Sequence, residues 1–177
     1  ALATPVALAI AAGRISEIGM IPMNMNALAA LPKTDILVLD KTGTLTNPGK
    51  FDLELQPAEA SIESHDLQAV MALADESSHP LSRAIADFMP RSGQTVLSEF
   101  SEKPGKGTTA KINGLQYWLG SRTWLTENGV TVPDTGEAGF SSQVFAASRQ
   151  KYLGCFLIRN RMRGDLGKTL TDLAIEY

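Results

Sequence analysis

The spacing of hydrophobic residues along the chain alternates between helical and strand periods. Apolar residues three and four positions apart predict helices over residues 4–21, 67–74, 80–88, 121–128 and 166–177. The first of these helices has Thr4 as its N-cap and Pro5 at its first helical position, and Pro22 ends it. Helical segments are therefore expected at both ends of the chain and in its middle.

Strand patterns lie between these helices. The continuous apolar run at residues 36–39 is typical of a strand buried on both faces, as in a parallel sheet covered by helices. Residues 51–55 alternate between apolar and polar, which predicts a half-exposed strand. Hairpins are predicted where 108–112 and 115–119 flank Asn113-Gly114, and where 143–147 precede 152–158.

These patterns predict an α/β chain in which an antiparallel module interrupts a unit built on a buried strand. The buried strand at 36–39 precedes the antiparallel region, and the helix at 166–177 follows it. Asp40 stands at the carboxyl end of the buried strand, where open α/β sheets place ligands and chemistry. Asn47-Pro48-Gly49 then predicts a loop.

The apolar stretch from Ala1 to Gly13 is too short to cross a bilayer. Arg14 interrupts it well before the roughly 20 residues that a transmembrane helix needs. It also lacks the basic leading segment and the initiating Met of a signal peptide. We interpret the chain as a piece of a longer protein, and the alternative is that this stretch is a buried core helix of a soluble domain.

Composition narrows the classes of function. The 177 residues are 44% hydrophobic and 20% charged, which is the balance of a globular protein of one or two domains and argues against disorder. Sixteen Lys and Arg residues against nineteen Asp and Glu residues give a formal net charge of −3, so there is no basic excess for binding nucleic acid or anionic lipid. Cys155 is the single cysteine, which excludes an intrachain disulfide and a cysteine-rich zinc site.

One motif carries most of the functional signal. Residues 40–46 read Asp-Lys-Thr-Gly-Thr-Leu-Thr, directly after the predicted buried strand. A carboxylate can attack a γ-phosphoryl group when cations and donors offset the repulsion between the two anions. Lys41, the hydroxyls of Thr42 and Thr44, the amides of a glycine-containing turn and a Mg²⁺ ion would supply this. The alternative is that Asp40 only forms a turn, and the full motif in its predicted context argues against it.

The motif matches the phosphorylation signature of P-type ATPases at every position, so the chain resembles that family. Leu2-Ala3-Thr4-Pro5 and Ser78-His79-Pro80-Leu81 are similar to segments of its heavy-metal-transporting members, in which a membrane helix with a Cys-Pro-Cys metal site runs into Leu-Ala-Thr-Pro. The wider haloacid-dehalogenase-like superfamily is also similar, but its phosphatases usually carry a second Asp where this chain has Thr42. Without that carboxylate nothing nearby activates water against an aspartyl-phosphate, which favours a pump over a phosphatase.

This resemblance implies a fold and a domain organisation. The expected fold is a partial haloacid-dehalogenase-like (Rossmann-type) phosphorylation domain with an inserted α+β nucleotide-binding domain built on an antiparallel sheet. The expected segments are the cytoplasmic end of a membrane helix and stalk at 1–31, the first part of the phosphorylation domain at 32–49, the nucleotide-binding domain at 50–157, and the truncated second part of the phosphorylation domain at 158–177. The protein would lie in a membrane with this segment on its cytoplasmic side, and the actuator and membrane domains of the same chain would be its partners.

The resemblance also implies roles for single residues. Asp40, Lys41, Thr42 and Thr44 would be catalytic, and Asp40 with Thr42 would hold Mg²⁺. The adenine nucleotide would be bound by His79, Gly105, Gly107 and Glu76, so that ATP and Mg²⁺ are the expected cofactors. Glycines allow close backbone approach to a ligand, although a His-Pro pair alone often only starts a helix.

Departures from the family pattern affect the expected affinity. Ala74 replaces the Glu that usually stands five residues before the His, and Glu76 is shifted in register from that place. Ser121 stands where the family has Asn, and Asn160 stands where the family pattern has Asp. Because each change removes a group that could bond nucleotide, we expect weak ATP binding or a rearranged pocket.

The expected function is ATP-driven transport of a soft heavy-metal ion, with copper favoured, through an aspartyl-phosphate on Asp40. The enzyme would be a P-type ATPase translocase, and this segment alone would not sustain turnover. One alternative is a soluble haloacid-dehalogenase-like phosphatase or phosphotransferase with a cap inserted after the nucleophile loop. Another is a non-catalytic nucleotide-binding module in which Asp40 stays unmodified.

Overall fold

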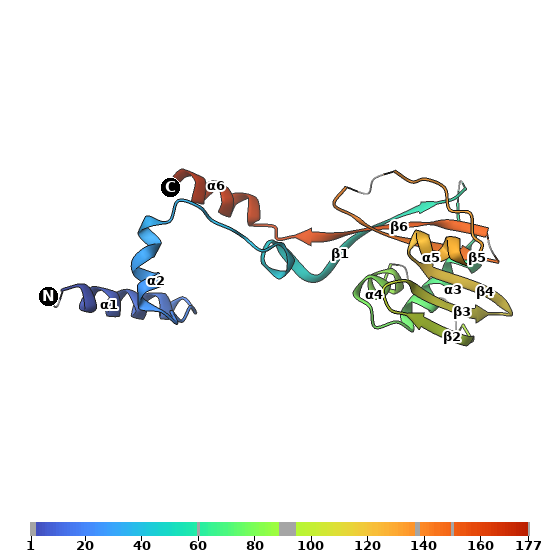
Figure 1. Ribbon diagram of the computed structural model, residues 1–177, viewed down its shortest axis with the longest axis horizontal. Coiled ribbons are helices and arrows are strands. Elements are labelled where there is room, and N and C mark those ends of the chain that lie inside the picture. The colour runs from blue at the N-terminus through green and yellow to red at the C-terminus, as the bar shows by residue number, and fades with distance from the viewer. Residues whose placement is uncertain (1–2, 60, 89–94, 137–138, 150, 177) are drawn as a thin grey trace. The chain divides into compact units, whose positions relative to one another are not determined.

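The computed structural model of the chain describes residues 3–59, 61–88, 95–136, 139–149 and 151–176. The chain divides into two compact units, one formed by Ala1–Asp40 with Gly167–Tyr177 and the other by Lys41–Leu166. Figure 1 shows the helices and strands of both units along the chain.

The first unit is helical and exposed. It contains α1 (Ala3–Glu17), α2 (Met25–Ala30), the short 3₁₀ turn η1 (Leu31–Lys33) and, from its second residue on, α6 (Leu166–Glu176). A helix is confirmed at each end of the chain, but α1 includes Thr4, the predicted N-cap, and it ends at Glu17 instead of continuing to Pro22. No residue within α1 or α2 is buried. Among the helices that the structure describes, none is both long enough and apolar enough to span a membrane.

Residues 36–39, predicted as a buried strand, have no regular structure. Ile36 is 74% exposed and Val38 is 88% exposed. A strand is stable when neighbouring strands satisfy its N–H and C=O groups, and none of the strands in the described ranges pairs with this segment. The prediction of a strand here is wrong, and the sheet of a phosphorylation domain is not seen among the described residues.

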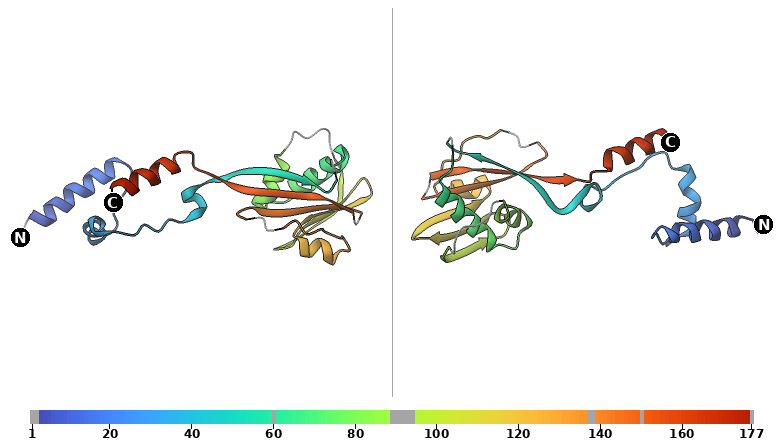
Figure 2. Two further views of the ribbon diagram at one scale, coloured as in Figure 1. Left: turned by 90° about the horizontal axis from the view of Figure 1, so that it is seen from above. Right: turned by 180° about the vertical axis from the view of Figure 1, so that it is seen from behind.

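The second unit is a six-stranded sheet with helices on both faces. Its strand order is β1-β6-β5-β4-β3-β2, and every neighbouring pair is antiparallel. In chain order its main elements are β1 (Thr46–Pro57), α3 (Ser64–Asp75), α4 (Pro80–Ala86), β2 (Leu97–Lys103), β3 (Gly107–Ile112), β4 (Leu115–Gly120), α5 (Arg122–Glu127), β5 (Ser142–Ser148) and β6 (Lys151–Met162). Figure 2 shows α3 and α4, in green, on one face of the sheet and α5, in orange, on the other.

The predicted hairpins and inner helices of this unit are confirmed. Asn113 and Gly114 have φ values of 52° and 79°, the positive values that a two-residue hairpin turn requires, so β3 and β4 join at the predicted point. β5 and β6 form the second hairpin. Gly129 ends the region of α5 with a φ of 82°, as expected for a glycine after a helix.

Two strand assignments differ from the sequence prediction. Asn47-Pro48-Gly49, predicted as a loop, lies within β1, where pairing with β6 is irregular between Thr46 and Phe51. Such an irregularity accommodates Pro48, which has no N–H for the ladder. β2 was not predicted, because it lies at the edge of the sheet and its residues are mostly polar and exposed.

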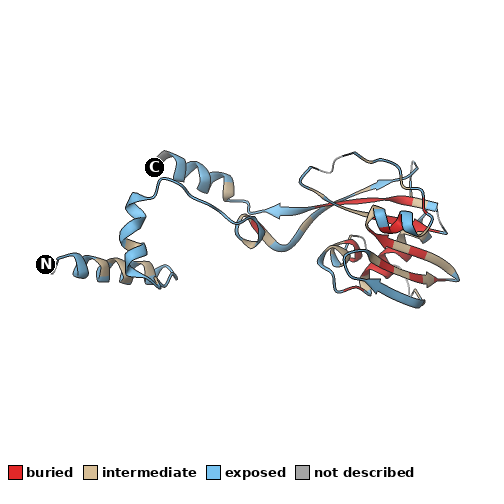
Figure 3. Ribbon diagram, in the orientation of Figure 1, coloured by how far each residue is buried: buried red, intermediate tan, exposed pale blue. Residues whose placement is uncertain are grey.

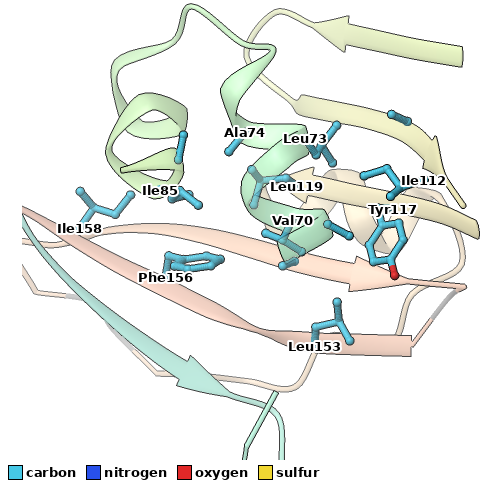
Figure 4. Close-up of a cluster of buried hydrophobic side chains, with 14 residues drawn as sticks. Val70, Leu73, Ala74, Ile85, Ile112, Tyr117, Leu119, Leu153, Phe156 and Ile158 are labelled. Atoms are coloured by element: carbon cyan, nitrogen blue, oxygen red, sulfur yellow. The ribbon is translucent and has the colours of Figure 1, made fainter. Parts of the chain in front are cut away.

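The buried residues, red in Figure 3, lie in the second unit. They form two hydrophobic cores. The larger core lies between the sheet and α3 with α4; Figure 4 shows Val70, Ile85 and Phe156 among its members. The smaller core lies beneath α5 and includes Trp124 and Cys155. Cys155 and Phe156 are neighbours in β6 that point to opposite cores, as the period of a strand requires.

Tyr117 joins β4 to α3 across the larger core. Its hydroxyl donates a 2.6 Å hydrogen bond to Asp66 Oδ1. Burial, followed by this hydrogen bond, raises the pKa of Tyr117 to about 12. The phenol is therefore a neutral donor near neutral pH and holds α3 on the sheet.

Candidate functional site

A pocket of about 550 Å³ lies where the start of α4 meets the β2–β3 turn and the end of β4. Its volume is within the range of small-molecule sites. It is lined by residues 78–82, 102–108, 119–121 and 143–144. Glu102 is the one carboxylate among these lining residues, and Lys103 and Lys106 are the cationic ones. The pocket therefore offers an apolar surface with a few charged groups of both signs.

His79 lies at the start of α4 and lines the pocket. Its Nδ1 accepts a 3.2 Å hydrogen bond from the Leu81 N–H, so the imidazole is the N-cap of the helix, and Pro80 follows at the first helical position. A neutral imidazole that accepts at Nδ1 carries its proton on Nε2. His79 therefore caps the helix with one nitrogen and keeps Nε2–H as a donor.

Glu102 is tied to the loop before α4 by a buried serine. Ser77 is 1% exposed, and its hydroxyl donates a 2.9 Å hydrogen bond to Glu102 Oε1. The same oxygen of Ser77 accepts a 3.1 Å hydrogen bond from the His79 N–H. These bonds fix the carboxylate of Glu102 relative to the backbone of His79 at the N-cap of α4.

The two predicted pocket glycines are required for different structural reasons. Gly105 has a φ of 73° in the β2–β3 turn, a conformation that favours glycine. At Gly107 the reason is space, because a Cβ there would lie 2.6 Å from both the Gly120 Cα and the Trp124 Cε3. The backbone of β3 therefore approaches β4 and α5 closely at this rim of the pocket.

Thr108 extends a row of paired residues across the pocket side of the sheet. It is the register partner of Glu102 on β2 and of Leu119 on β4, so the three side chains project from the same face. Thr108 is 3% exposed, and its Oγ1 is the buried side-chain oxygen without a hydrogen-bond partner among the described residues. Buried hydroxyls are normally paired, so this one needs an explanation.

The pocket rim at Gly120 and Ser121, and Arg122 next to it, are fixed by local bonds. Ser121 Oγ accepts a 3.2 Å hydrogen bond from the Trp124 N–H and caps α5. Arg122 donates to Asp134 Oδ1 at 3.1 Å and lies 5.5 Å from the centroid of the Phe145 ring. The Gly136 N–H, and then Arg122, lower the pKa of Asp134. Ser121, a departure from the family pattern, therefore has a structural role as a helix cap.

The turn that follows Asp40 in the sequence opens the second unit. This turn, η2 (Lys41–Leu45), is irregular, with Gly43 at a φ of 80°. Thr46 Oγ1 accepts from the Gly43 N–H and donates to the Lys41 carbonyl, each at 3.3 Å, and Arg163 Nη2 donates to the Gly43 carbonyl at 3.2 Å. The turn is therefore closed by Thr46 and held to the residue that follows β6.

The predicted site residues fall into two groups. His79, Gly105 and Gly107 line one pocket, although β2 lies between His79 and the two glycines in the sequence. Glu76 is not among the lining residues; it is exposed at the end of α3. Asp40, the last residue of the first unit, is exposed.

The other predicted catalytic residues of the 40–46 motif are exposed, whereas the two remaining departures from the family pattern, Ala74 and Asn160, differ in burial. Lys41, Thr42 and Thr44 are exposed in η2. Ala74 is fully buried in the larger core, and Asn160 is exposed on β6.

Sequence reasoning missed Glu102 and Thr108. The signal available was the sequence Glu-Lys-Pro-Gly-Lys-Gly-Thr, in which both residues flank the predicted glycines. A hairpin through those glycines would have paired the two flanking residues, but β2 was too polar to be recognised as a strand.

The related sequences and the similar solved structures all belong to one class of protein. No family model matches the chain. The chain is 31% identical over 175 residues to the probable copper-transporting ATPase SynA of Synechococcus elongatus, a match that covers 97% of this chain and 22% of that protein. A crystal structure of a zinc-transporting PIB-type ATPase in the E2.Pi state superposes with a TM-score of 0.72 and 22% identity, over 97% of this chain and 29% of that one. The N-domain of HMA6, a copper-transporting P-type ATPase, superposes with a TM-score of 0.53 and 21% identity, over 62% of this chain and 98% of that one.

The six-stranded antiparallel sheet with its flanking helices thus has the fold of a P-type ATPase nucleotide-binding domain. The chain belongs to the heavy-metal-transporting P-type ATPases. It spans about a fifth of the length of its curated relative SynA, to which it aligns over 22% of that protein.

Proposed function

We propose that the pocket at the start of α4 binds ATP. The observation that carries this proposal is that His79, Gly105 and Gly107, separate in the sequence, line one cavity of about 550 Å³. His79 offers an aromatic face and an Nε2–H donor to a base. Lys103 on the same rim offers positive charge to phosphates, whereas Lys106 is ion-paired with Glu127. The fold of a P-type ATPase nucleotide-binding domain supports the same ligand.

We also propose that Asp40 is the phosphorylated residue, in a haloacid-dehalogenase-like phosphorylation domain. A carboxylate oxygen of Asp40 would attack the γ-phosphorus, forming an aspartyl-phosphate as the bond to the bridging oxygen breaks and ADP leaves. The support is the complete motif at 40–46 and the closed turn η2 that follows Asp40. Lys41, Thr42 and Thr44 would offset the negative charge of the phosphoryl group.

Mg²⁺ fits this motif only together with the nucleotide. Magnesium in such sites takes one or two carboxylates and completes its shell with water and phosphate oxygens. Asp40 and Thr42 supply one carboxylate and one hydroxyl. Within the described ranges no group of three or more His, Cys, Asp or Glu side chains is placed to hold a metal ion. We therefore propose Asp40 and Thr42 as ligands that add to those of the ATP phosphates, whose charge the ion would neutralise.

For the whole protein we propose ATP-driven transport of a soft heavy-metal ion across a membrane. The names of relatives that transport copper and zinc support the class of cargo, and the Leu2-Ala3-Thr4-Pro5 segment favours copper. The segments 1–31, 32–49, 50–157 and 158–177 would belong to a membrane helix with its stalk, the phosphorylation domain, the nucleotide-binding domain and the phosphorylation domain again. Actuator and membrane domains of the same chain would be its partners.

Isothermal titration of the 177-residue chain with ATP tests the binding proposal. His79→Asn keeps a side-chain oxygen that can cap α4 but removes the aromatic ring. Since stacking of a base on an aromatic side chain contributes about 1–3 kcal/mol, we expect ATP affinity to fall about tenfold.

His65→Asn is the matched control for this titration. His65 is the second histidine of the chain, lies exposed at the start of α3 and does not line the pocket. We expect His65→Asn to bind ATP as the unmodified chain does. Equal affinity of His79→Asn and the unmodified chain would contradict the proposed site.

A further inference from the structure

Two side chains of the pocket, Glu102 and Thr108, have no part in the proposal above. They are directly opposed on β2 and β3, so both project from the same face of the sheet. Both line the pocket together with Leu119, the next residue of the same row. A carboxylate and a hydroxyl thus stand side by side at the edge of an apolar surface.

The carboxylate of Glu102 is oriented before any ligand arrives. The Ser77 hydroxyl donates to Oε1 at 2.9 Å, and the His79 N–H in turn donates to the Ser77 oxygen at 3.1 Å. A carboxylate has acceptor sites on two oxygens, so this bond leaves acceptor capacity on Glu102. Through Ser77 the carboxylate is thus held to the backbone N–H of His79, the residue whose ring is proposed to contact the base.

The hydroxyl of Thr108 is a donor and acceptor without a protein partner in the described part of the chain. Its Oγ1 is buried and makes no hydrogen bond there, although Thr108 lines the pocket. An unpaired buried hydroxyl is unfavourable in the free protein, and a ligand that supplies the missing partner removes that penalty. Thr108 is therefore a second, independent indication of a polar ligand group at this place.

We propose that Glu102 and Thr108 form the pair that recognises the base of the nucleotide, an inference that rests on the proposed binding of ATP. Glu102 accepts a hydrogen bond from the exocyclic amino group, and the Thr108 hydroxyl donates to the neighbouring ring nitrogen. Adenine presents such an amino donor beside a ring acceptor on either of its edges. The acceptor and donor of this pair are complementary to that arrangement.

The same pair discriminates against guanine. At the corresponding position guanine carries a carbonyl oxygen, which is an acceptor and would face the acceptor oxygens of Glu102. A site built to hydrogen-bond one group of a ligand discriminates against an analogue that leaves its polar groups unpaired. The pocket is therefore specific for a 6-aminopurine nucleotide, with ATP bound more tightly than GTP.

Titrations of the 177-residue chain with ATP and with GTP test this pair. Glu102→Gln provides both an acceptor and a donor, so it accommodates the guanine oxygen as well as the adenine amino group. We expect the ratio of the GTP to the ATP dissociation constant to fall about tenfold in this variant. Glu99→Gln, which changes an exposed glutamate of the same strand that pairs with Lys111 outside the pocket, should leave the ratio unchanged.

Thr108→Val and Thr108→Ser separate the hydroxyl from the methyl group. Thr108→Val removes the unpaired hydroxyl at nearly constant shape, so we expect an unchanged or higher thermal midpoint together with about tenfold weaker ATP binding. Thr108→Ser should keep the ATP affinity. A merely structural threonine would instead make the valine variant bind ATP as the unmodified chain does.

Each result decides between the possibilities. An unaltered GTP-to-ATP ratio in Glu102→Gln, or equal weakening of both nucleotides, overturns base recognition by Glu102 while leaving the proposed function intact. Normal ATP affinity in Thr108→Val overturns the role of Thr108. Failure of the unmodified chain to bind ATP at millimolar concentration overturns the proposed function, and this inference with it.

Discussion

His79 combines a structural and a proposed ligand-binding role in one side chain. Its Nδ1 caps α4, and its ring lines the pocket. Ser121 likewise caps α5 on the pocket rim. Substituting a cap by alanine costs about 1 kcal/mol, so an alanine variant at either residue would alter stability as well as the site. Variants that preserve the cap are therefore needed to isolate binding.

Cys155 provides a residue-scale test of the packing beneath α5. It is fully buried in β6, and desolvation raises the pKa of its thiol to about 11. Because the thiolate is the reactive form, we expect the folded chain to react very slowly with a disulfide reagent at pH 8 and rapidly once urea unfolds it. Fast modification of the folded chain at pH 8, before any change in circular dichroism, would contradict this packing.

The same thiol makes the stability of the fold depend on pH at alkaline values. Folding raises its pKa from 9.0 to about 11, so the folded state retains the proton that the unfolded state loses. The free energy of unfolding therefore has its full value below pH 9, where Cys155 is protonated in both states. It falls as the pH rises through about 11, because the unfolded state loses the proton first. Thiol modification in the folded state should therefore stay slow until the pH approaches that range.

At the scale of elements, the pocket rim depends on a close junction of β3, β4 and α5. Gly107 and Gly120 are register partners, and Trp124 of α5 packs over both. Lys106, in the turn before β3, forms a 2.6 Å ion pair with Glu127 of α5. The glycine pattern of the pocket therefore serves the packing of α5 on the sheet as well as access for a ligand.

Gly107→Ala tests this junction. Its methyl group would overlap the Leu119 carbonyl oxygen, the Gly120 Cα and Trp124, so we expect a loss of about 1–3 kcal/mol in unfolding free energy by urea denaturation. Gly164→Ala is the control, because a Cβ there meets no atom within 4 Å. An unchanged midpoint for Gly107→Ala would show that the strands and α5 are not packed as described.

At the scale of the whole molecule, the sequence predicted best the parts whose structure is set locally. The Asn113-Gly114 turn, the His79-Pro80 helix start and the apolar stripe of α3 each depend on neighbouring residues, and all are confirmed. β2 was missed because an edge strand derives its structure from pairing with β3 rather than from its own pattern. The strand predicted at residues 36–39 is absent because an apolar run forms a strand only when neighbouring strands pair with it, and none of the described strands does.

The candidate site also combines residues that local motifs identify with residues that only strand pairing brings together. His79, Gly105 and Gly107 were identified from short motifs, and they meet in one pocket. Glu102 and Thr108 emerge only from the register between two strands, which no local pattern specifies. Long-range pairing is therefore the information that sequence reasoning lacked at this site.

The most direct test of the account is to map ATP on the chain by amide NMR. Saturable shifts confined to residues 78–82, 102–108, 119–121 and 143–144 are the predicted result, because these segments line the pocket. Shifts gathered instead around Lys50 and Arg161, which line a separate cavity beside β1 and α4, would contradict the assignment of the site. An absence of saturable shifts at millimolar ATP would contradict nucleotide binding itself.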